Sequence, residues 1–151
     1  MARELIKEHG LTGWRFEWDN ATSRLGLCSY AKRTIQLSRK PTFHRPESDV
    51  RLTILHEIAH ALVGGRNGHN DVWRAKCYSI GGDGKRCGAV PQEAVAQIAP
   101  WVLICPNCNK KSPRHRKTAT KYACGACVRR FGRSRMGEFY LRWASSSSLT
   151  A

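Results

Sequence analysis

The sequence predicts an α+β fold, in which a small antiparallel sheet and two helices form one domain and a cysteine-rich module follows it. Three observations support this prediction. Short segments with strand-like apolar patterns occupy residues 14–38, and a longer segment with a helical apolar period follows from residue 46. Two Cys-x-x-Cys pairs lie in the last third of the chain. With 151 residues, the chain has room for one small domain and one appended module.

Three short strands are expected before the long helix. A helix over residues 2–9 precedes them and ends at Gly10, a common stop residue. Residues 14–18 alternate large apolar with charged side chains, the pattern of a half-buried strand. Residues 25–30 and 33–38 show further strand patterns. We therefore expect these three segments to form a small antiparallel sheet.

The long helix is expected to bury one face. Residues 46–49 provide a proline, a capping hydroxyl and acidic side chains for its first turn. Apolar residues then recur at Ile54, Ile58 and Leu62, the spacing of a helix with one apolar face. Glycines at positions 64 and 65 indicate its end.

A partner helix and a separate module complete the expected organisation. The helix begins near residues 70–71 and places Trp73, Cys77 and Ile80 at helical spacing. In the module, residues 101–104 and 139–143 have strand patterns. The expected regions are residues 1–84 for the α+β domain, 85–100 for a connector with a short helix near 92–98, 101–143 for the cysteine-rich module and 144–151 for a disordered serine-rich tail.

Positive charge is concentrated in the last third of the chain. Residues 1–100 carry 15 Lys/Arg against 10 Asp/Glu, whereas residues 101–151 carry 11 against one, Glu138. Such asymmetry favours a polyanionic partner, most often nucleic acid, because Lys and Arg replace counterions condensed on phosphates. A basic surface that serves only solubility is the alternative.

No segment predicts export or membrane insertion. No apolar run approaches the roughly 20 residues that span a bilayer. The first ten residues mix charges and lack the apolar centre of a signal peptide. We therefore expect a cytoplasmic protein with no membrane partner, associated with a nucleoid or located in the cytoplasm of a host cell. In that setting, the paired cysteine spacings favour metal binding over disulfides.

The long helix contains an HExxH motif at residues 56–60. His56 and His60 lie four residues apart, so on a helix both imidazoles project from one face and can bind one zinc ion. Glu57 lies beside them, where it can take a proton from a water molecule that attacks a carbonyl. Two buried histidines with no ligand function are the alternative.

A catalytic zinc site of this type needs a third protein ligand. A histidine six residues after the second one is absent, because position 66 is Arg66. Glu93 is a candidate on a downstream helix, and Asp71 could bind through oxygen. His69 is favoured, because the glycine-rich turn before it lets the chain reverse toward the histidine face. For stabilising an oxyanion, Tyr78 and Arg74 are the nearest candidates in sequence.

The residues around this motif follow a family pattern. HEIAHAL at 56–62 is preceded by LGLCSY at 25–30 and TIQLS at 34–38, and is followed by HNDVWR at 69–74 and IGG at 80–82. In these segments the chain resembles the SprT-like metallopeptidases, the group that includes Spartan. Counting the cysteine module, the resemblance covers roughly residues 10–143. The chain departs from the family at Asn70, where glycine is frequent, and in the short loop between the two helices.

The resemblance implies a zincin-like core and a specific activity. It implies that His56, His60 and His69 hold a catalytic zinc, with Glu57 as the general base. It also implies proteolysis of DNA-associated proteins, as in the removal of DNA–protein crosslinks.

The cysteine module is expected to hold a second, structural zinc. Cys105 and Cys108 form one Cys-x-x-Cys pair, and Cys124 and Cys127 form the other. Two such pairs with 15 residues between them suit a closed four-cysteine site, whose binding energy stabilises a module with a small core. A redox dithiol pair is the alternative, but no thioredoxin-like βαβ pattern surrounds it.

Basic residues lie between and after the cysteine pairs, with Tyr122, Phe131 and Tyr140 nearby. They could hold phosphates while aromatic rings stack on unpaired bases, or the rings could be the small core of the module. No base-reading helix is evident, so we expect DNA, with single strands as one candidate form, to be bound without sequence specificity. The expected contacts are Lys110, Lys111, Arg114, Arg116, Lys117, Lys121, Arg129, Arg130, Arg133 and Arg135.

Together these features predict a zinc-dependent metallopeptidase that acts on proteins on DNA. The main alternative is a non-catalytic, zinc-ribbon nucleic-acid-binding protein on a metallopeptidase scaffold. A peptidase for free proteins, whose basic module contacts an acidic partner, is a second alternative. A nuclease is a weaker third, because neither zinc site offers the carboxylate-rich arrangement usual for magnesium.

Overall fold

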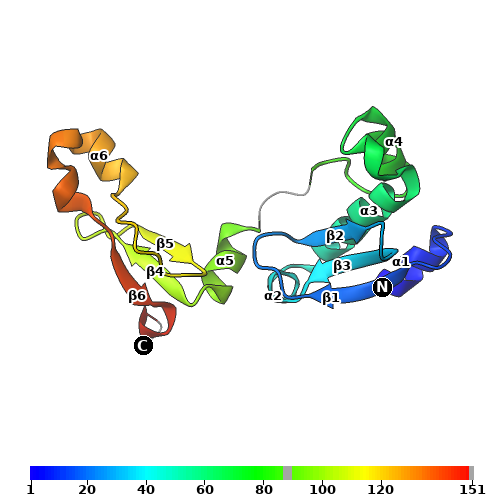
Figure 1. Ribbon diagram of the computed structural model, residues 1–151, viewed down its shortest axis with the longest axis horizontal. Coiled ribbons are helices and arrows are strands. Elements are labelled where there is room, and N and C mark those ends of the chain that lie inside the picture. Colours follow the sequence, from blue (N-terminus) through cyan, green and yellow to red (C-terminus); the bar gives the residue numbers. More distant parts are fainter. Residues whose placement is uncertain (87–89, 150–151) are drawn as a thin grey trace. The chain divides into compact units, whose positions relative to one another are not determined.

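A computed structural model describes residues 1–86 and 90–149 of the chain (Figure 1). The chain divides into two compact units, Met1–Ala94 and Val95–Ala151. Both combine helices with a small sheet, so the α+β prediction is confirmed. Residues 87–89 of the expected connector and the last two residues of the expected tail lie outside the described residues.

The first unit contains a sheet of three strands, β1 (Arg15–Asp19), β2 (Gly26–Ser29) and β3 (Thr34–Ser38), in the order β1-β3-β2 (Figure 1). β2 and β3 pair antiparallel, but β1 and β3 run parallel. The expectation of a purely antiparallel sheet is therefore wrong for one pair. The reason is that the chain crosses from β1 past the position of β3 before it forms β2, and β3 then fills the gap between them.

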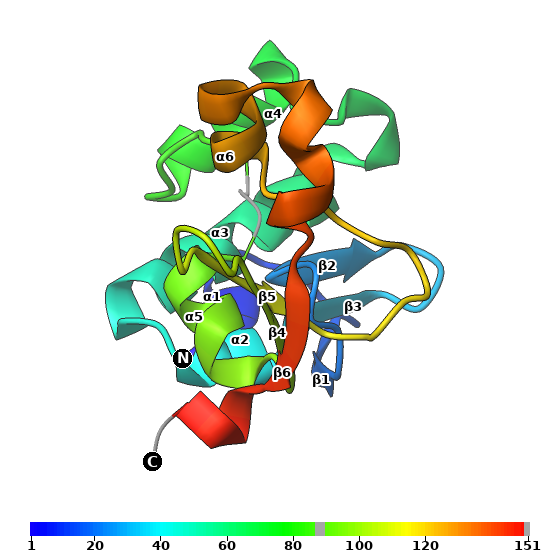
Figure 2. The same cartoon turned by 90° about the vertical axis from the view of Figure 1, so that its left-hand side faces the viewer.

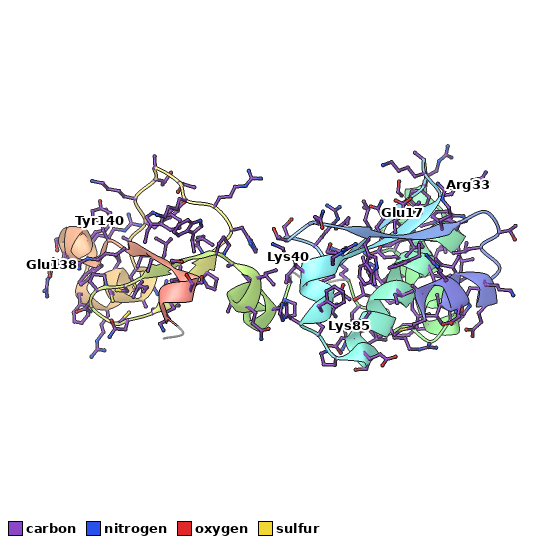
Figure 3. All side chains as sticks on the ribbon, turned by 90° about the horizontal axis from the view of Figure 1, so that it is seen from below. Glu17, Arg33, Lys40, Lys85, Glu138 and Tyr140 are labelled. Carbon is purple, nitrogen blue, oxygen red and sulfur yellow. The ribbon has the colours of Figure 1, made fainter. Side chains whose placement is uncertain are left out.

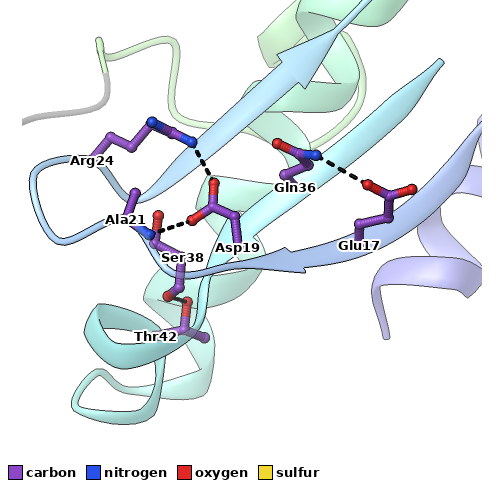
Figure 4. Close-up of polar contacts among 7 residues, drawn as sticks. All are labelled: Glu17, Asp19, Ala21, Arg24, Gln36, Ser38 and Thr42. Atoms are coloured by element: carbon purple, nitrogen blue, oxygen red, sulfur yellow. Dashed lines mark hydrogen bonds and ion pairs between the residues drawn. The ribbon is translucent and has the colours of Figure 1, made fainter. Parts of the chain in front are cut away.

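The crossing loop after β1 is stabilised by the carboxylate of Asp19 (Figure 4). Its Oδ1 accepts the backbone N–H of Ala21 at 2.8 Å, and its Oδ2 accepts Nη2 of Arg24 at 2.6 Å. At the same edge, Thr42 Oγ1 donates to the carbonyl of Ser38 at 2.8 Å, where α2 (Arg39–Phe43) begins. These bonds place Leu25, which is buried, at the entrance to β2.

Helix α3 (Glu47–Val63) packs against β2 and β3 and forms the core with them. Ile54, Leu55 and Ile58 of this helix are fully buried against Ile35 and Leu37 of β3. Helix α1 (Ala2–Glu8) adds Leu5 and Ile6 to the same cluster. The apolar face that the sequence predicts for residues 54–62 is thus the face on the sheet, which fixes the rotation of α3 about its axis.

A glycine turn joins α3 to its partner helix. Gly64 ends α3 with φ of +81°, a conformation that favours glycine, and η1 (Gly65–Asn67) follows. Helix α4 (Asp71–Ser79) follows Asn70, whose side chain accepts the backbone N–H of Trp73 at 3.1 Å. Asn70, a departure from the family pattern, is therefore the N-cap of α4.

The second unit is built on another sheet of three strands, in the order β5-β4-β6 (Figure 2). β4 (Trp101–Ile104) pairs antiparallel with both β5 (Lys111–Arg114) and β6 (Arg142–Ser145). The other elements of this unit are α6 (Gly125–Phe131), η2 (Arg133–Phe139) and η3 (Ser146–Leu149), and α5 (Gln92–Ile98) contains the boundary between the two units. The helix near 92–98 and the strand at 101–104 are present as expected, whereas the sequence analysis did not predict β5.

The end of the chain differs from the sequence-based expectation. The closing strand lies at Arg142–Ser145 instead of 139–143. Phe139 lies before the strand because its side chain packs in the core beside the cysteines. Residues expected to be a disordered tail continue into η3, where Ser146 donates from Oγ to the carbonyl of Ala99 at 2.6 Å. Among the helices of residues 1–86 and 90–149, none combines the length and the apolar character needed to cross a membrane.

Candidate active site and metal centres

Three histidines from two parts of the first unit meet at one point. His56 and His60 project from successive turns of α3, and His69 comes from the turn just before α4. Their Nε2 atoms are separated by 3.2 Å for His56 and His60, 3.1 Å for His60 and His69, and 3.0 Å for His56 and His69. The structure therefore brings together the three residues that the sequence suggested as ligands.

The geometry of this trio suits a zinc ion. Nitrogens that bind zinc tetrahedrally at about 2.0–2.1 Å are roughly 3.3 Å apart, close to the separations seen here. Three neutral imidazoles cannot satisfy one another at these distances, because at least two of the three Nε2 atoms would meet as donors or as acceptors. A cation at the centre resolves this conflict, so the residues fit the metal.

The histidines are held in the form that binds a metal. Burial lowers the pKa of His56 to about 4, with a smaller contribution from the two neighbouring histidines. Burial likewise lowers the pKa of His60 to about 4 and shifts that of His69 downward. At neutral pH all three rings are uncharged, so their lone pairs are free for a cation without prior loss of a proton.

Contacts behind the histidines fix their orientation. Nδ1 of His56 donates to the backbone carbonyl of Lys85 at 3.1 Å, which leaves Nε2 as the metal-facing atom. Trp73, which is fully buried, packs against all three rings, with centroid distances of 4.6 Å to His56, 5.2 Å to His60 and 4.6 Å to His69. The first turns of α4 therefore act as a support for the site.

Glu57 faces the sheet beside the histidines and is almost fully buried. Burial raises its pKa to about 7, although a backbone hydrogen bond from Cys28 opposes the shift. At neutral pH its carboxyl group is thus poised between its protonated and its charged forms. A group with such a pKa can both accept and return a proton.

A cleft of about 350 Å³ opens at this point. Its walls include β2, the three histidines, Glu57 and Tyr30. β2 is an edge strand, because none of the described strands pairs with its outer side. Tyr30 donates from its hydroxyl to the carbonyl of His60 at 3.0 Å, which ties the end of the β2–β3 hairpin to α3. An extended peptide can therefore reach Glu57 and the histidines along β2.

Three other candidates of the sequence analysis, Asp71, Arg74 and Tyr78, do not line the cleft. Asp71 is 95% exposed and pairs with Arg74, and both lie on the outer side of α4. Tyr78 is 57% exposed and does not line the cleft. The side chain of Glu93 lies outside what the structure describes. Tyr30 lines the cleft instead, and sequence reasoning missed it because its position depends on the hairpin.

Gly26 is a second residue that sequence reasoning missed. A Cβ atom at this position would lie 2.8 Å from Oε1 and 2.9 Å from Cγ of Glu57, and 3.1 Å from the carbonyl of Gln36. Only glycine lets β2 pass this close to the carboxyl group. An isolated glycine in a strand pattern is the sequence signal that could have indicated this approach.

Replacing Gly26 with alanine should displace Glu57 without removing a histidine. We expect Gly26→Ala to lower kcat of any hydrolysis by about 10²-fold, because misplacement of a catalytic group by about 1 Å has effects of this size. Zinc content, measured by atomic absorption, should stay at the wild-type value. Gly137→Ala is the matched control, since a Cβ there meets nothing within 4 Å. Wild-type kcat in Gly26→Ala would contradict this role.

Four cysteines of the second unit form another cluster. Sγ of Cys105 lies 3.7 Å from that of Cys127, and Sγ of Cys108 lies 3.7 Å from that of Cys124. Thiolates that bind zinc tetrahedrally at about 2.3 Å are roughly 3.8 Å apart, so this cluster also fits the metal. Nδ2 of Asn107 approaches Sγ of Cys127 at 3.4 Å and could stabilise a charged thiolate.

The basic residues of the second unit are distributed over several elements. Lys111 and Arg114 lie on β5, Arg129 and Arg130 on α6, and Arg133 and Arg135 in η2. Lys110, Arg116, Lys117 and Lys121 lie in the connections before and after β5. Arg135 pairs with Glu138, which Figure 3 labels, so its charge is partly neutralised.

Aromatic rings accompany this charge. Nζ of Lys117 lies 3.9 Å from the ring centroid of Trp101, and the guanidinium of Arg114 lies 5.7 Å from that of Tyr122. Phe131 is 39% and Tyr140 is 38% exposed, so neither is a full core residue. Phe139, in contrast, is buried against the cysteines.

Comparison with known proteins gives one match. The model of the SprT-like family matches residues 2–93, which include the sheet, α3, the three histidines and α4. No curated protein and no solved structure matches the chain. The matched range ends before the cysteine cluster.

Proposed function

Because the chain belongs to the SprT-like family, we propose that it is a zinc metallopeptidase that hydrolyses proteins bound to DNA. The observation that carries this proposal is the placement of Glu57 in a cleft beside three histidines whose Nε2 atoms are spaced for one zinc ion. We assign a catalytic zinc to His56, His60 and His69, and a structural zinc to the four cysteines.

The catalytic roles follow from the positions of the side chains. Zinc, when bound, supplies a Lewis acid that polarises the scissile carbonyl and lowers the pKa of water. Glu57 accepts a proton from the attacking water as the water oxygen bonds to the carbonyl carbon. It then donates that proton to the amide nitrogen as the C–N bond breaks. The edge of β2 holds the peptide in extended form through backbone hydrogen bonds.

The DNA partner is supported by the charge and the aromatic side chains of the second unit. Exposed cations on β5, α6 and the connections between them can contact phosphates, while Tyr140 and Phe131 offer partly exposed rings for unpaired bases. None of these features selects a base sequence, so the protein should recognise the DNA backbone. Its affinity for DNA should therefore fall as the salt concentration rises. Attachment to DNA would raise the local concentration of DNA-bound substrates near the cleft.

A cleavage assay with a protein crosslinked to DNA tests this function. We expect the full-length, zinc-loaded chain to cleave that protein faster on single-stranded or duplex DNA than without DNA. A variant in which Arg116, Lys117 and Lys121 are replaced by glutamine should lose most of the DNA stimulation. The slope of log affinity against log salt should also fall, by about 2–3.

The control carries the same change in net charge in the first unit. Arg3, Lys7 and Arg51 are replaced by glutamine, and we expect DNA stimulation to remain. Equal cleavage with and without DNA would contradict the DNA-directed part of the proposal and favour a peptidase for free proteins. DNA binding without any cleavage would favour the non-catalytic binding protein.

A further inference from the structure

A second cavity adjoins the cleft on the N-terminal side of His56. It measures about 200 Å³ and lies between the first half of α3 and residues 83–86. Leu52, Thr53 and His56 line it from α3, Arg45 lines it from just before α3, and Lys85 and Arg86 line it from the segment after α4. Lys85 is labelled in Figure 3.

The cavity and the cleft share a boundary. His56 lines both of them, and Leu25 lines the cavity while the next residue, Gly26, lines the cleft. A peptide that lies along β2 with its scissile bond at Glu57 therefore has the mouth of the cavity beside it. The cavity is therefore placed to receive a side chain of that peptide.

The direction of the peptide decides which side chain enters. Antiparallel pairing with an edge strand is slightly more stable per residue than parallel pairing. A peptide antiparallel to β2 passes Tyr30 first, then Glu57 beside Gly26, and then Leu25. The residue after the scissile bond thus lies at the cavity.

The charged side chains of the cavity give it a preference. Three cations, Arg45, Lys85 and Arg86, line it together with two carboxylates, Asp49 and Asp83. No ion pair within residues 1–86 and 90–149 involves any of these three cations. Asp83 already accepts the backbone N–H of Lys85 through Oδ1 at 3.0 Å. The surplus charge is therefore positive.

Arg45 is also oriented by the protein. Its Nη1 donates to Oγ1 of Thr53 at 2.9 Å, and its Nη2 donates to the carbonyl of Asp49 at 3.2 Å. Both acceptors are uncharged, so the guanidinium keeps its full charge next to the cavity. Because Arg45 is already held in place, its side chain loses less conformational entropy when a ligand binds.

We propose that this cavity is the subsite for the residue after the scissile bond and that it selects an acidic side chain. The proposal rests on the function assigned above and adds to it a class of substrate: peptides with glutamate or aspartate directly after the cleaved bond. Charge-assisted hydrogen bonds from Lys85 and Arg86 to the carboxylate supply the selectivity.

Lys85 and Arg86 are suitable for a test because both side chains are exposed. His56 contacts the backbone carbonyl of Lys85, so replacing the Lys85 side chain leaves that hydrogen bond in place. Arg39 and Lys40 on α2 are equally exposed cations that do not line the cavity. They provide the matched control.

The experiment measures binding as well as hydrolysis. Three peptide hydroxamates are made, in which the metal-binding group replaces the scissile amide and the next residue is Glu, Gln or Lys. Their affinities for the zinc-loaded full-length chain are measured by calorimetry. Three matched peptides with a cleavable bond are assayed for kcat/KM. We expect the Glu compounds to exceed the Gln compounds by about tenfold in both measurements.

The variants then assign the selectivity to the cavity. In Lys85→Gln/Arg86→Gln the Glu and Gln compounds should differ by less than about twofold, and in Lys85→Glu/Arg86→Glu the Lys compound should be preferred. In Arg39→Gln/Lys40→Gln the wild-type preference should remain.

The outcomes separate this inference from the function it rests on. Zinc-dependent binding of all three hydroxamates with equal affinity would overturn the subsite and leave the metallopeptidase in place. Retention of the Glu preference in Lys85→Glu/Arg86→Glu would do the same. Failure of the zinc-loaded chain to bind any hydroxamate and to cleave any peptide would overturn the metallopeptidase assignment and the subsite with it.

Discussion

Glu57→Gln is expected to lower kcat/KM for peptide hydrolysis by about 10³-fold, within the range of general acid–base catalysis. This loss corresponds to about 4 kcal/mol of transition-state stabilisation. Glutamine has the shape of glutamate and can accept the backbone hydrogen bond from Cys28, but it cannot take a proton from water. Because Glu57 is not one of the three histidine ligands, zinc content should not change.

The same substitution should stabilise the metal-free protein. The pKa of Glu57 in the folded chain is about 7, above its ordinary value of 4.5, because burial penalises the charged form. The stability associated with the protonated acid is therefore present below the ordinary value and is lost as pH rises through about 7. Glutamine avoids this loss, so the increase in Tm caused by Glu57→Gln should be larger at pH 8 than at pH 5.

Glu47→Gln is the control for both measurements, because Glu47 is an exposed acid in the first turn of the same helix. It should leave kcat/KM and the pH dependence of Tm close to wild type. Hydrolysis that persists in Glu57→Gln with full zinc content would remove the proposed general base. A Tm difference that is larger at pH 5 would show that burial does not dominate the environment of Glu57.

The sequence was sufficient to predict the histidine trio because the relevant constraints are local. The spacing of His56 and His60 fixes their common face on α3, and the glycine turn before His69 leaves few other directions for the chain. The family resemblance derived from those segments agrees with the match of the SprT-like family over residues 2–93.

Strand order could not be predicted in the same way. β3 lies between the other two strands, and its polar residues Thr34 and Ser38 are fully buried along with Ile35 and Leu37. The apolar and polar residues of this segment indicated a strand, but not that the strand lies between two others. The roles of Gly26 and Tyr30 depend on the packing of β2 against α3, which brings Gly26 to Glu57 and Tyr30 to the carbonyl of His60.

In the second unit, the sequence predicted the metal cluster but not one of the strands. The cysteine spacing predicted the cluster, but the segment that forms β5, KSPR, carries charge and a proline and has no strand pattern. It forms a strand because β4 offers it an edge next to the cysteine turn. Proline at position 113 is tolerated there because β5 is itself an edge strand.

Cys124→Ala should unfold the second unit while the first unit stays folded. The buried cluster around this residue consists of Cys105, Cys124, Cys127 and Phe139, so three of the four proposed zinc ligands make up most of this cluster. Without the metal, this cluster loses its central bonds and leaves buried thiols facing one another. Structural zinc contributes apparent folding free energies of about 10–16 kcal/mol in small zinc-finger peptides, more than a small domain can lose.

The measurement combines zinc analysis with NMR of the full-length chain. We expect zinc content to fall from two ions to one per chain, and the amide signals of residues 95–149 to collapse into the range of unfolded peptides. Signals from β1 to α4 should keep their dispersion. Cys77→Ala is the control, because Cys77 is a buried thiol of the first unit that belongs to neither metal cluster. It should keep both zinc ions and the signals of both units.

Cys124→Ala also tests whether peptide hydrolysis and stimulation by DNA belong to different units. Since residues 2–93 contain the histidines and Glu57, hydrolysis of a short peptide without DNA should continue at a rate within about twofold of wild type. Stimulation by DNA should disappear, because the basic side chains lose the folded surface that presents them. If peptide hydrolysis instead fell together with zinc content, the second unit would be part of the catalytic machinery. If DNA stimulation survived the loss of the second zinc, the contacts with DNA would have to lie in the first unit.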